Sequence, residues 1–345
     1  MNAHLSPQPV ARNRSESYWA IVRRQFWKRR LNRAACAVIA LLFAVGLLAD
    51  FVASDLPILL SLEGETYVFP NLLRPPELRR WDNTLLLEEM GENDWAVMPP
   101  VPWGYNSHDL SSVLSPPGPG HVLGTDSEGR DVLSRVVHGT RVSLAVGVLS
   151  VVVVVLIGVV LGSVAAYFGG AFDLLLMRLV EVVHALPTIL LLVTILSVVM
   201  LSGWASVVGM MLVIGLVGWT GVARLTRGEI LKVKTMEYVE AARALGYSHL
   251  RIVARHILPN SISPVLVSAT FAMAAAILIE SALSFLGFGI SPDMASWGGL
   301  LSDGRKHADA WWLAVFPGAA IFVTVTVYNM AGEGLRDAID PRLKV

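Results

Sequence analysis

The sequence predicts an all-α membrane protein with six transmembrane helices and an extracytoplasmic insertion between the first two. Three observations predict this class. Of the 345 residues, 54% are hydrophobic and 16% are charged, and the mean hydropathy is +0.59, which is too apolar for an ordinary soluble domain. Several uncharged stretches reach the roughly 20 residues that a helix needs to cross a bilayer. Lysine and arginine are concentrated in separate segments.

Apolar stretches define the six predicted spans. The stretch from Val182 to Ala223 contains no Asp, Glu, Lys or Arg and is long enough for two spans, which the polar turn LSGWAS at 201–206 separates. The last span opens with a tryptophan pair, a residue type that favours the membrane interface. The predicted spans are residues 34–54, 142–167, the two halves of 182–223, about 262–286, and 311–332.

The distribution of lysine and arginine predicts the orientation. Residues 1–33 carry eight basic residues and one acid, and the loop 224–261 carries seven basic residues and three acids. With six spans both segments lie on one side, which the positive-inside rule makes cytoplasmic. The C-terminal tail 334–345 is then cytoplasmic as well. The segment 55–140, with thirteen acids and five arginines, is extracytoplasmic.

The extracytoplasmic segment is rich in proline turns. The stretches RPPE, MPPVPWGY and SPPGPG exclude long helices from much of residues 55–120. Six aromatic residues are enough for a small folded lid, whereas a passive spacer is the alternative, and the sequence favours neither. These aromatic residues are Tyr67, Phe69, Trp81, Trp95, Trp103 and Tyr105.

The loop 224–261 predicts two short amphipathic helices. In the first, Tyr238, Ala241, Ala242 and Leu245 have the i, i+3, i+4, i+7 spacing of one apolar helical face. Gly246 suits the left-handed residue that ends many helices.

The second helix is predicted to begin after Ser248, a plausible N-cap. Leu250, Val253 and Ile257 repeat the apolar stripe, and Pro259 ends the helix. Each helix has only about ten residues, fewer than the 12–15 at which isolated helices become marginally stable in water. Both helices must therefore be held by packing against the membrane domain, a partner, or both.

Several motifs in this loop and elsewhere carry a family resemblance. The loop residues are Glu240, Ala241, Ala242, Gly246, Leu258 and Pro259, and they resemble the EAA loop of type I ABC importer permeases, with His256 where the general pattern favours Ile. Further matching stretches are LGTDSEGRDVLSRVVHGTRVSL, ESALSFLGFG, SWGGLLSDGR and GLRDAIDPR. Together they are similar to the C-type subunit of dipeptide and oligopeptide permeases. The insertion, with GETYVFP and GHVLGTD, resembles the subgroup of microcin C and extended-peptide importers.

The resemblance implies a peptide import function and an assembly. It implies a five-helix permease core at 141–333 in the bacterial inner membrane, with the EAA loop at 224–261 in a groove of a cytoplasmic ATPase subunit. A homologous permease would complete the cargo path, and an extracytoplasmic binding protein would deliver a peptide. This chain would bind no cofactor, because ATP and Mg²⁺ belong to the ATPase subunits, and no nucleic acid is expected.

Glu280 is an ionisable residue within the predicted fifth span, which is by default a functional hypothesis. It either lines the translocation path or hydrogen-bonds within the bundle, and the second interpretation is preferred. His184 and Pro187 indicate a kinked helix rather than a metal site, since no second ligand stands at metal spacing. The single cysteine, Cys36, is interpreted as a small buried hydrophobe.

Charges alternate just before the second span. We interpret them as an amphipathic helix at the membrane interface that anchors the bundle, rather than as catalytic groups. These residues are Asp126, Arg130, Asp131 and Arg135.

Two other functions are considered and disfavoured. A stand-alone secondary transporter would place coupling ions at broken helices near the midplane, but the sequence offers only Glu280 and His184 and no visible inverted repeat. An intramembrane enzyme is disfavoured because the sequence contains no phosphate-binding Gly-rich loop, no H-E-x-x-H and no G-x-S-x-G. No catalytic or metal-ligating residue is therefore predicted.

Overall fold

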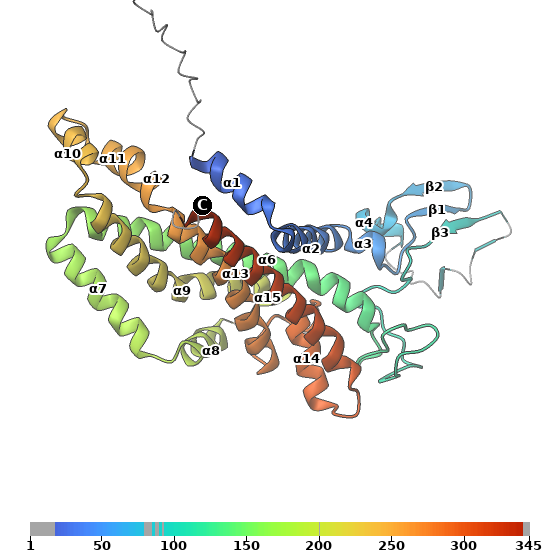
Figure 1. Ribbon diagram of the computed structural model, residues 1–345. Helices are drawn as coiled ribbons and strands as arrows, with labels where there is room; N and C mark the ends of the chain where they lie inside the picture. The colour runs from blue at the N-terminus through green and yellow to red at the C-terminus, as the bar shows by residue number, and fades with distance from the viewer. Residues whose placement is uncertain (1–17, 79–84, 87–89, 92, 200, 341–345) are drawn as a thin grey trace, which may run out of the picture.

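The computed structural model describes residues 18–78, 85–86, 90–91, 93–199 and 201–340. Residues 1–17 of the predicted basic N-terminus and residues 341–345 of the predicted tail lie outside this range. The described chain is mostly helical, with a small sheet in the segment after the first long helix (Figure 1).

Before residue 169, the helices that the described residues form are α1 (Tyr18–Lys28), α2 (Arg30–Leu47), α3 (Ala49–Val52), α4 (Pro70–Leu73), the 3₁₀ turn η1 (Pro76–Leu78) and α6 (Val132–Phe168). Those that follow are α7 (Gly170–Ala185), α8 (Thr188–Val198), α9 (Gly203–Val233), α10 (Glu237–Ala244), α11 (His249–Ile252), the π-helical turn η2 (Val253–Ile257), α12 (Leu258–Ser261), α13 (Ser263–Phe285), α14 (Trp297–Lys306) and α15 (Trp312–Ile339).

Within the described residues, five helices are long and apolar enough to cross a membrane, namely α2, α6, α9, α13 and α15. The remaining predicted span, in the first half of 182–223, is not one straight helix. It is formed by the end of α7 and by α8, which are bent by 88° relative to each other. The bend lies at Pro187, because proline lacks an amide hydrogen and restricts Leu186 to an extended conformation. The kink expected there is therefore present, and the bent pair is the candidate for the sixth span.

The centre of the bundle is the packing of α6 against α9. Gly158 and Gly162 of α6 face Val222 and Ala223 of α9 so closely that a Cβ atom at Gly162 would lie 2.5 Å from the carbonyl oxygen of Ala223. Small residues let membrane helices approach in this way, since lipid provides no hydrophobic driving force between them. α13 packs against α6 and α15, and α2 also packs against α6 and α15.

The segment after α3 contains a folded unit with its own small core. Three antiparallel strands, β1 (Leu59–Leu62), β2 (Glu65–Val68) and β3 (Trp95–Val97), pair in the order β2-β1-β3. One face of this sheet covers the buried side chains of Leu56, Leu60, Leu78 and Leu86. The described part of the insertion is thus structured, whereas its role as a lid or as a spacer stays a prediction.

Candidate functional site

The coupling loop (residues 234–262) leaves the end of α9 and folds back on the membrane domain. Val239 and Ala242 of α10 are buried against Ala166 at the end of α6 and against Ile230 and Val233 at the end of α9. Ile252 and Ile257 join the same cluster from the second half of the loop. The loop is therefore held by apolar packing against the ends of two long helices, as short helices require.

The predicted apolar stripe of α10 is only partly buried within this chain. Tyr238 and Leu245 are 43% and 71% exposed, and Ala241 is exposed as well. Of the four stripe residues only Ala242 points inward, where it pairs with Val239, three residues earlier. The helix has apolar residues on two faces, and the face that contains Val239 is the one that packs against the membrane domain.

An apolar surface consequently remains on the outside of the coupling loop. We call it the outward coupling face and define it by residues Met236, Tyr238, Leu245, Tyr247 and Leu250, each of which is exposed. Glu240 and Ala241 lie exposed on the same helix. The Glu240 carboxylate makes no ion pair within the described part of the chain, and it stands in the first turn of α10, where the helix dipole favours an acid.

Gly246 ends α10 as predicted. Its φ is +75°, its amide donates to the carbonyl of Arg243 at 2.9 Å, and the amide of Tyr247 donates to the carbonyl of Ala242 at 3.2 Å. This pair of bonds is the Schellman arrangement, which requires a left-handed residue at the position of Gly246. No other part of the described chain lies within 4 Å of the place where a Cβ atom would stand.

The second half of the loop differs from the prediction in two respects. Leu250 is 80% exposed, so the inward positions are Ile252 and Ile257 rather than the full predicted stripe. Ser248 occupies the N-cap position, but its side chain makes no capping bond.

Pro259 does not end the helix. The wide π turn of η2 precedes it, and α12 begins at Leu258, so that proline stands in a first turn where its missing amide hydrogen is not needed. Pro259 is exposed and Leu258 is half-buried against the loop's core cluster.

Polar and aromatic contacts fix the loop to α6. The hydroxyl of Tyr167 lies 2.8 Å from Nδ1 of His249, and the guanidinium of Arg243 lies 5.7 Å from the centre of the Tyr167 ring. Lys234 donates to the carbonyl of Ala166 at 2.7 Å. A displacement of the coupling loop would therefore be passed to the end of α6 through several contacts at once.

Glu280 is fully buried in α13. The hydroxyl of Ser284 donates to its carboxylate at 2.9 Å, and those of Ser281 and Ser143 do so at 3.4 Å. Ser143 belongs to α6, so the carboxylate joins two spans through hydroxyl donors. This geometry favours the packing interpretation over the path-lining one.

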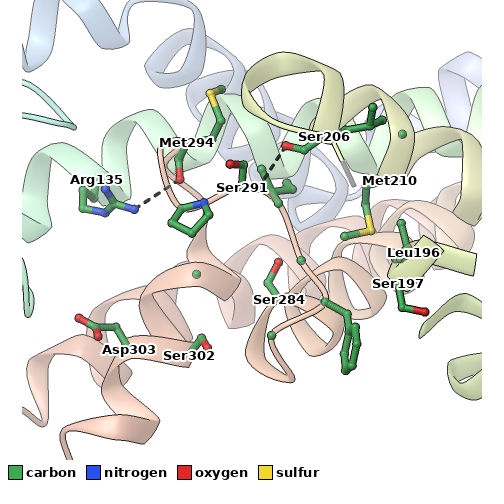
Figure 2. A pocket seen from close by; sticks show the side chains of 18 of the residues that line it. Arg135, Leu196, Ser197, Ser206, Met210, Ser284, Ser291, Met294, Ser302 and Asp303 are labelled. Atoms are coloured by element: carbon green, nitrogen blue, oxygen red, sulfur yellow. Dashed lines mark hydrogen bonds between the residues drawn. The ribbon is translucent and has the colours of Figure 1, made fainter. Parts of the chain in front are cut away.

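A cavity of about 640 Å³ lies between α8, the beginning of α9 and the link from α13 to α14. We call it the outer cavity; Figure 2 shows Ser197, Met210, Ser284 and Asp303 around it. Its size is within the usual range for a ligand site. The link that closes one side is fixed by the amide of Ser291, which donates to the hydroxyl of Ser206 at 3.1 Å (Figure 2).

The alternating charges before the second span do not form an interfacial helix, and that prediction is wrong. Asp126, Arg130, Asp131 and Arg135 are all buried. Arg130 Nε donates to Asp126 at 2.8 Å, and Asp131 caps α6 by accepting from the amide of Ser134 at 2.7 Å. These charges satisfy one another and nearby backbone groups, which allows their burial.

Arg135 and its neighbours form one wall of the outer cavity, a contribution that the sequence did not indicate. Its guanidinium donates to the carbonyls of Tyr105 at 3.1 Å and Met294 at 3.4 Å. Both acceptors come from segments distant in the sequence. A local charge pattern gives no signal for such contacts.

The loop that precedes α6 also holds an Asp–His–Asp arrangement. Nδ1 of His121 lies 2.9 Å from the Asp131 carboxylate and Nε2 lies 3.3 Å from that of Asp109. Donation from the Ser111 hydroxyl lowers the pKa of Asp109 to about 2, whereas burial raises the pKa of Asp131. Among the residues that the structure describes, no group of three or more His, Cys, Asp or Glu side chains is placed to hold a metal ion.

Comparison with known families is decisive for the class of protein. Residues 158–345 match the family described as binding-protein-dependent transport system inner membrane component. The chain belongs to this family. This stretch contains the coupling loop, Glu280 and most of the lining of the outer cavity. The chain is thus a multi-pass inner-membrane transport permease.

Three curated relatives illustrate the range of this permease family. The dipeptide transport system permease protein DppC of Bacillus subtilis is 42% identical over 68% of this chain and 73% of its own length. The glutathione transport system permease protein GsiD of Pectobacterium atrosepticum is 41% identical over 69% of this chain and 78% of its own. The peptidoglycan transport system permease protein YejE of Agrobacterium fabrum is 32% identical over 88% of this chain and 87% of its own.

Among solved structures, this permease matches an inward-facing structure of the MetNI methionine ABC transporter. The sequence identity is 20% and the TM-score is 0.46, over 60% of this chain and 95% of that chain.

Proposed function

We propose that the chain is the permease subunit of an ATP-driven importer of peptides or peptide-like molecules, and that the coupling loop receives force from a cytoplasmic ATPase subunit. The observation that carries the proposal is that α10 is packed on one side and exposed on the other. One side is fixed to the ends of α6 and α9, and the other side exposes Tyr238 and Leu245. Exposed apolar surface of this kind, on a loop rimmed by polar residues, is typical of a docking site.

Force would pass from the ATPase to the spans as rigid-body motion. ATP-driven closure of two ATPase subunits would draw the coupling loops of two permeases together. Because the coupling loop contacts Tyr167 of α6 through Arg243 of α10 and His249 of α11, the helix ends would follow, and the path would change from inward-facing to outward-facing. ATP and Mg²⁺ would be bound by the ATPase subunits alone.

A homologous permease would cover the bent pair of helices. In α7 only Leu176 and Val180 are buried, and in α8 only Leu192 is buried. Most of the apolar surface of this pair is therefore exposed and would be covered by a neighbouring protein or by lipid. We propose that the pair forms the sixth span and that the cargo path runs between the two bundles. Glu280 is then a packing residue that stiffens one wall.

The orientation follows from the basic segments. With the coupling loop and both termini in the cytoplasm, the sheet of the insertion and the outer cavity lie on the extracytoplasmic side. A binding protein would deliver cargo there, as the family description supports. The peptide class is supported by the names of the relatives, and the microcin C subgroup stays a prediction.

Uptake by purified complexes tests the proposal. The chain is coexpressed with its partner permease and ATPase subunits, and the complex is reconstituted into vesicles. The vesicles should accumulate a labelled dipeptide or glutathione only when ATP and binding protein are present. Vesicles with an ATPase variant unable to hydrolyse ATP are the control. Uptake by this chain alone without ATP would instead establish a secondary transporter, and turnover of the peptide would indicate an enzyme.

A further inference from the structure

Helix α1 exposes a basic face that also carries tryptophan. Val22 is buried where α1 packs against α2 and α15. On another side of the helix, Trp19, Arg23 and Trp27 follow one another at intervals of four residues. The two tryptophan side chains are 43% and 49% exposed. An apolar aromatic body next to a cationic group is the composition of helices that lie in a membrane interface.

The position of α1 brings this face to the basic end of the first span. Arg29 separates α1 from α2 in an extended conformation, with φ −79° and ψ 127°, so α1 leaves the line of α2 and runs beside the end of α15 (Figure 1). The corner is fixed by the Arg29–Asp337 ion pair. Asn32 donates its side-chain amide to the carbonyl of Phe26 at 2.9 Å, which fixes it further.

Four cations around this corner have no acidic partner among the residues that the structure describes. Arg23, Lys28, Arg30 and Arg33 are exposed, and none of them forms an ion pair within the described part of the chain. A groove of about 220 Å³ lies beside Lys28, and is lined also by Arg29, Asn32 and Asp337. The corner therefore offers uncompensated positive charge next to exposed indole rings.

We propose that α1 lies in the headgroup layer of the bilayer and binds anionic phospholipid headgroups. Lipid is the occupant that fits, because α1 is joined to a membrane span by a single residue and combines tryptophan with basic side chains. Each lysine or arginine near an anionic membrane surface raises the affinity for that membrane about fivefold. The identity of the leaflet rests on the proposed orientation, whereas the binding itself does not depend on the transport function.

Spin-label accessibility tests the location of α1. In a Cys36→Ser background of the full chain, labels at Trp19→Cys and Trp27→Cys are compared in phosphatidylethanolamine–phosphatidylglycerol vesicles. Leu41→Cys, on the exposed side of α2, is the lipid control, and Leu110→Cys, exposed in the outer segment, is the water control. The labels on α1 should collide with oxygen more than with a water-soluble nickel chelate, as at Leu41. Preference for nickel at both sites overturns the proposal, and so does protection from both reagents, which would indicate a protein partner such as the ATPase.

Headgroup selectivity tests the charges. The protein should prefer spin-labelled phosphatidylglycerol over phosphatidylcholine, and the Arg23→Gln/Lys28→Gln double variant should lower that preference severalfold. Lys232→Gln is the matched control, since Lys232 is exposed and already paired with Glu229 at 2.7 Å, and it should leave the preference unchanged. Salt should weaken the preference of the unaltered protein by screening. An unchanged preference in the double variant, or an equal loss in the control, overturns the assignment of the headgroup contact to α1.

Discussion

Gly246 gives the sharpest test of the coupling loop. Its φ of +75° costs any other residue except Asn and Asp about 1–2 kcal/mol, and no neighbouring group lies within 4 Å of the future Cβ atom. Gly246→Ala should therefore lower stability by about 1–2 kcal/mol, a small part of the 5–15 kcal/mol typical of a folded domain. Gly246→Glu should carry the same backbone cost and no clash inside the chain. Any much larger effect of the glutamate must come from a partner that covers Leu245 and Tyr247.

The assay measures association and coupling separately. Gly246→Glu should reach the membrane in normal amounts but abolish uptake, with ATPase subunits that copurify poorly or hydrolyse ATP without responding to cargo. Gly246→Ala should keep most of the uptake. Gly170→Glu is the matched control, because Gly170 also has a positive φ, +62°, with nothing within 4 Å, but lies outside the outward coupling face. Normal uptake and normal ATPase association in Gly246→Glu would refute the coupling assignment.

Four further predictions follow from the same structure. Ala241→Trp, on the exposed side of α10, should weaken ATPase association while leaving stability unchanged. Ala242→Trp should instead lower the melting temperature of the isolated chain, because its site is filled by Ile230 and Val233; equal effects at both positions would contradict the orientation of α10. In a cysteine-free background, a thiol at Ser112 should react with an impermeant reagent from outside and one at Ser248 only after permeabilisation, and the reverse pattern would refute the topology. Replacing residues 63–118 by a Gly/Ser linker should impair uptake without preventing assembly, whereas full uptake at limiting cargo would establish the passive spacer. Glu280→Ala should destabilise the bundle by about 1–3 kcal/mol, because the hydroxyls of Ser143 and Ser284 lose their acceptor. Glu280→Gln should largely retain stability and uptake. Loss of uptake at an unchanged melting temperature in Glu280→Gln would support the path-lining role.

Local sequence was sufficient for the features that depend on local chemistry. The long apolar stretches located α2, α6, α9, α13 and α15 because a span needs only enough consecutive apolar residues to cross the bilayer. Gly246 was recognisable as a helix end because the conformation it adopts is set by its missing Cβ atom. Pro187 marked the bend between α7 and α8 for an equally local reason, its missing amide hydrogen.

Tertiary contacts decided which face of each element points inward. On α10 both Tyr238 and Val239 are apolar, and Val239 is buried because Ile230 and Val233 lie on its side. The charges of Asp126 and Arg130 were expected at a surface, yet they are buried because Pro292, distant in the sequence, supplies a carbonyl at 3.2 Å to Arg130. Likewise the hydroxyl of Ser143 reaches Glu280 from another helix. Sequence pattern determines whether a segment can form a helix, but burial depends on partners that only the folded chain brings together.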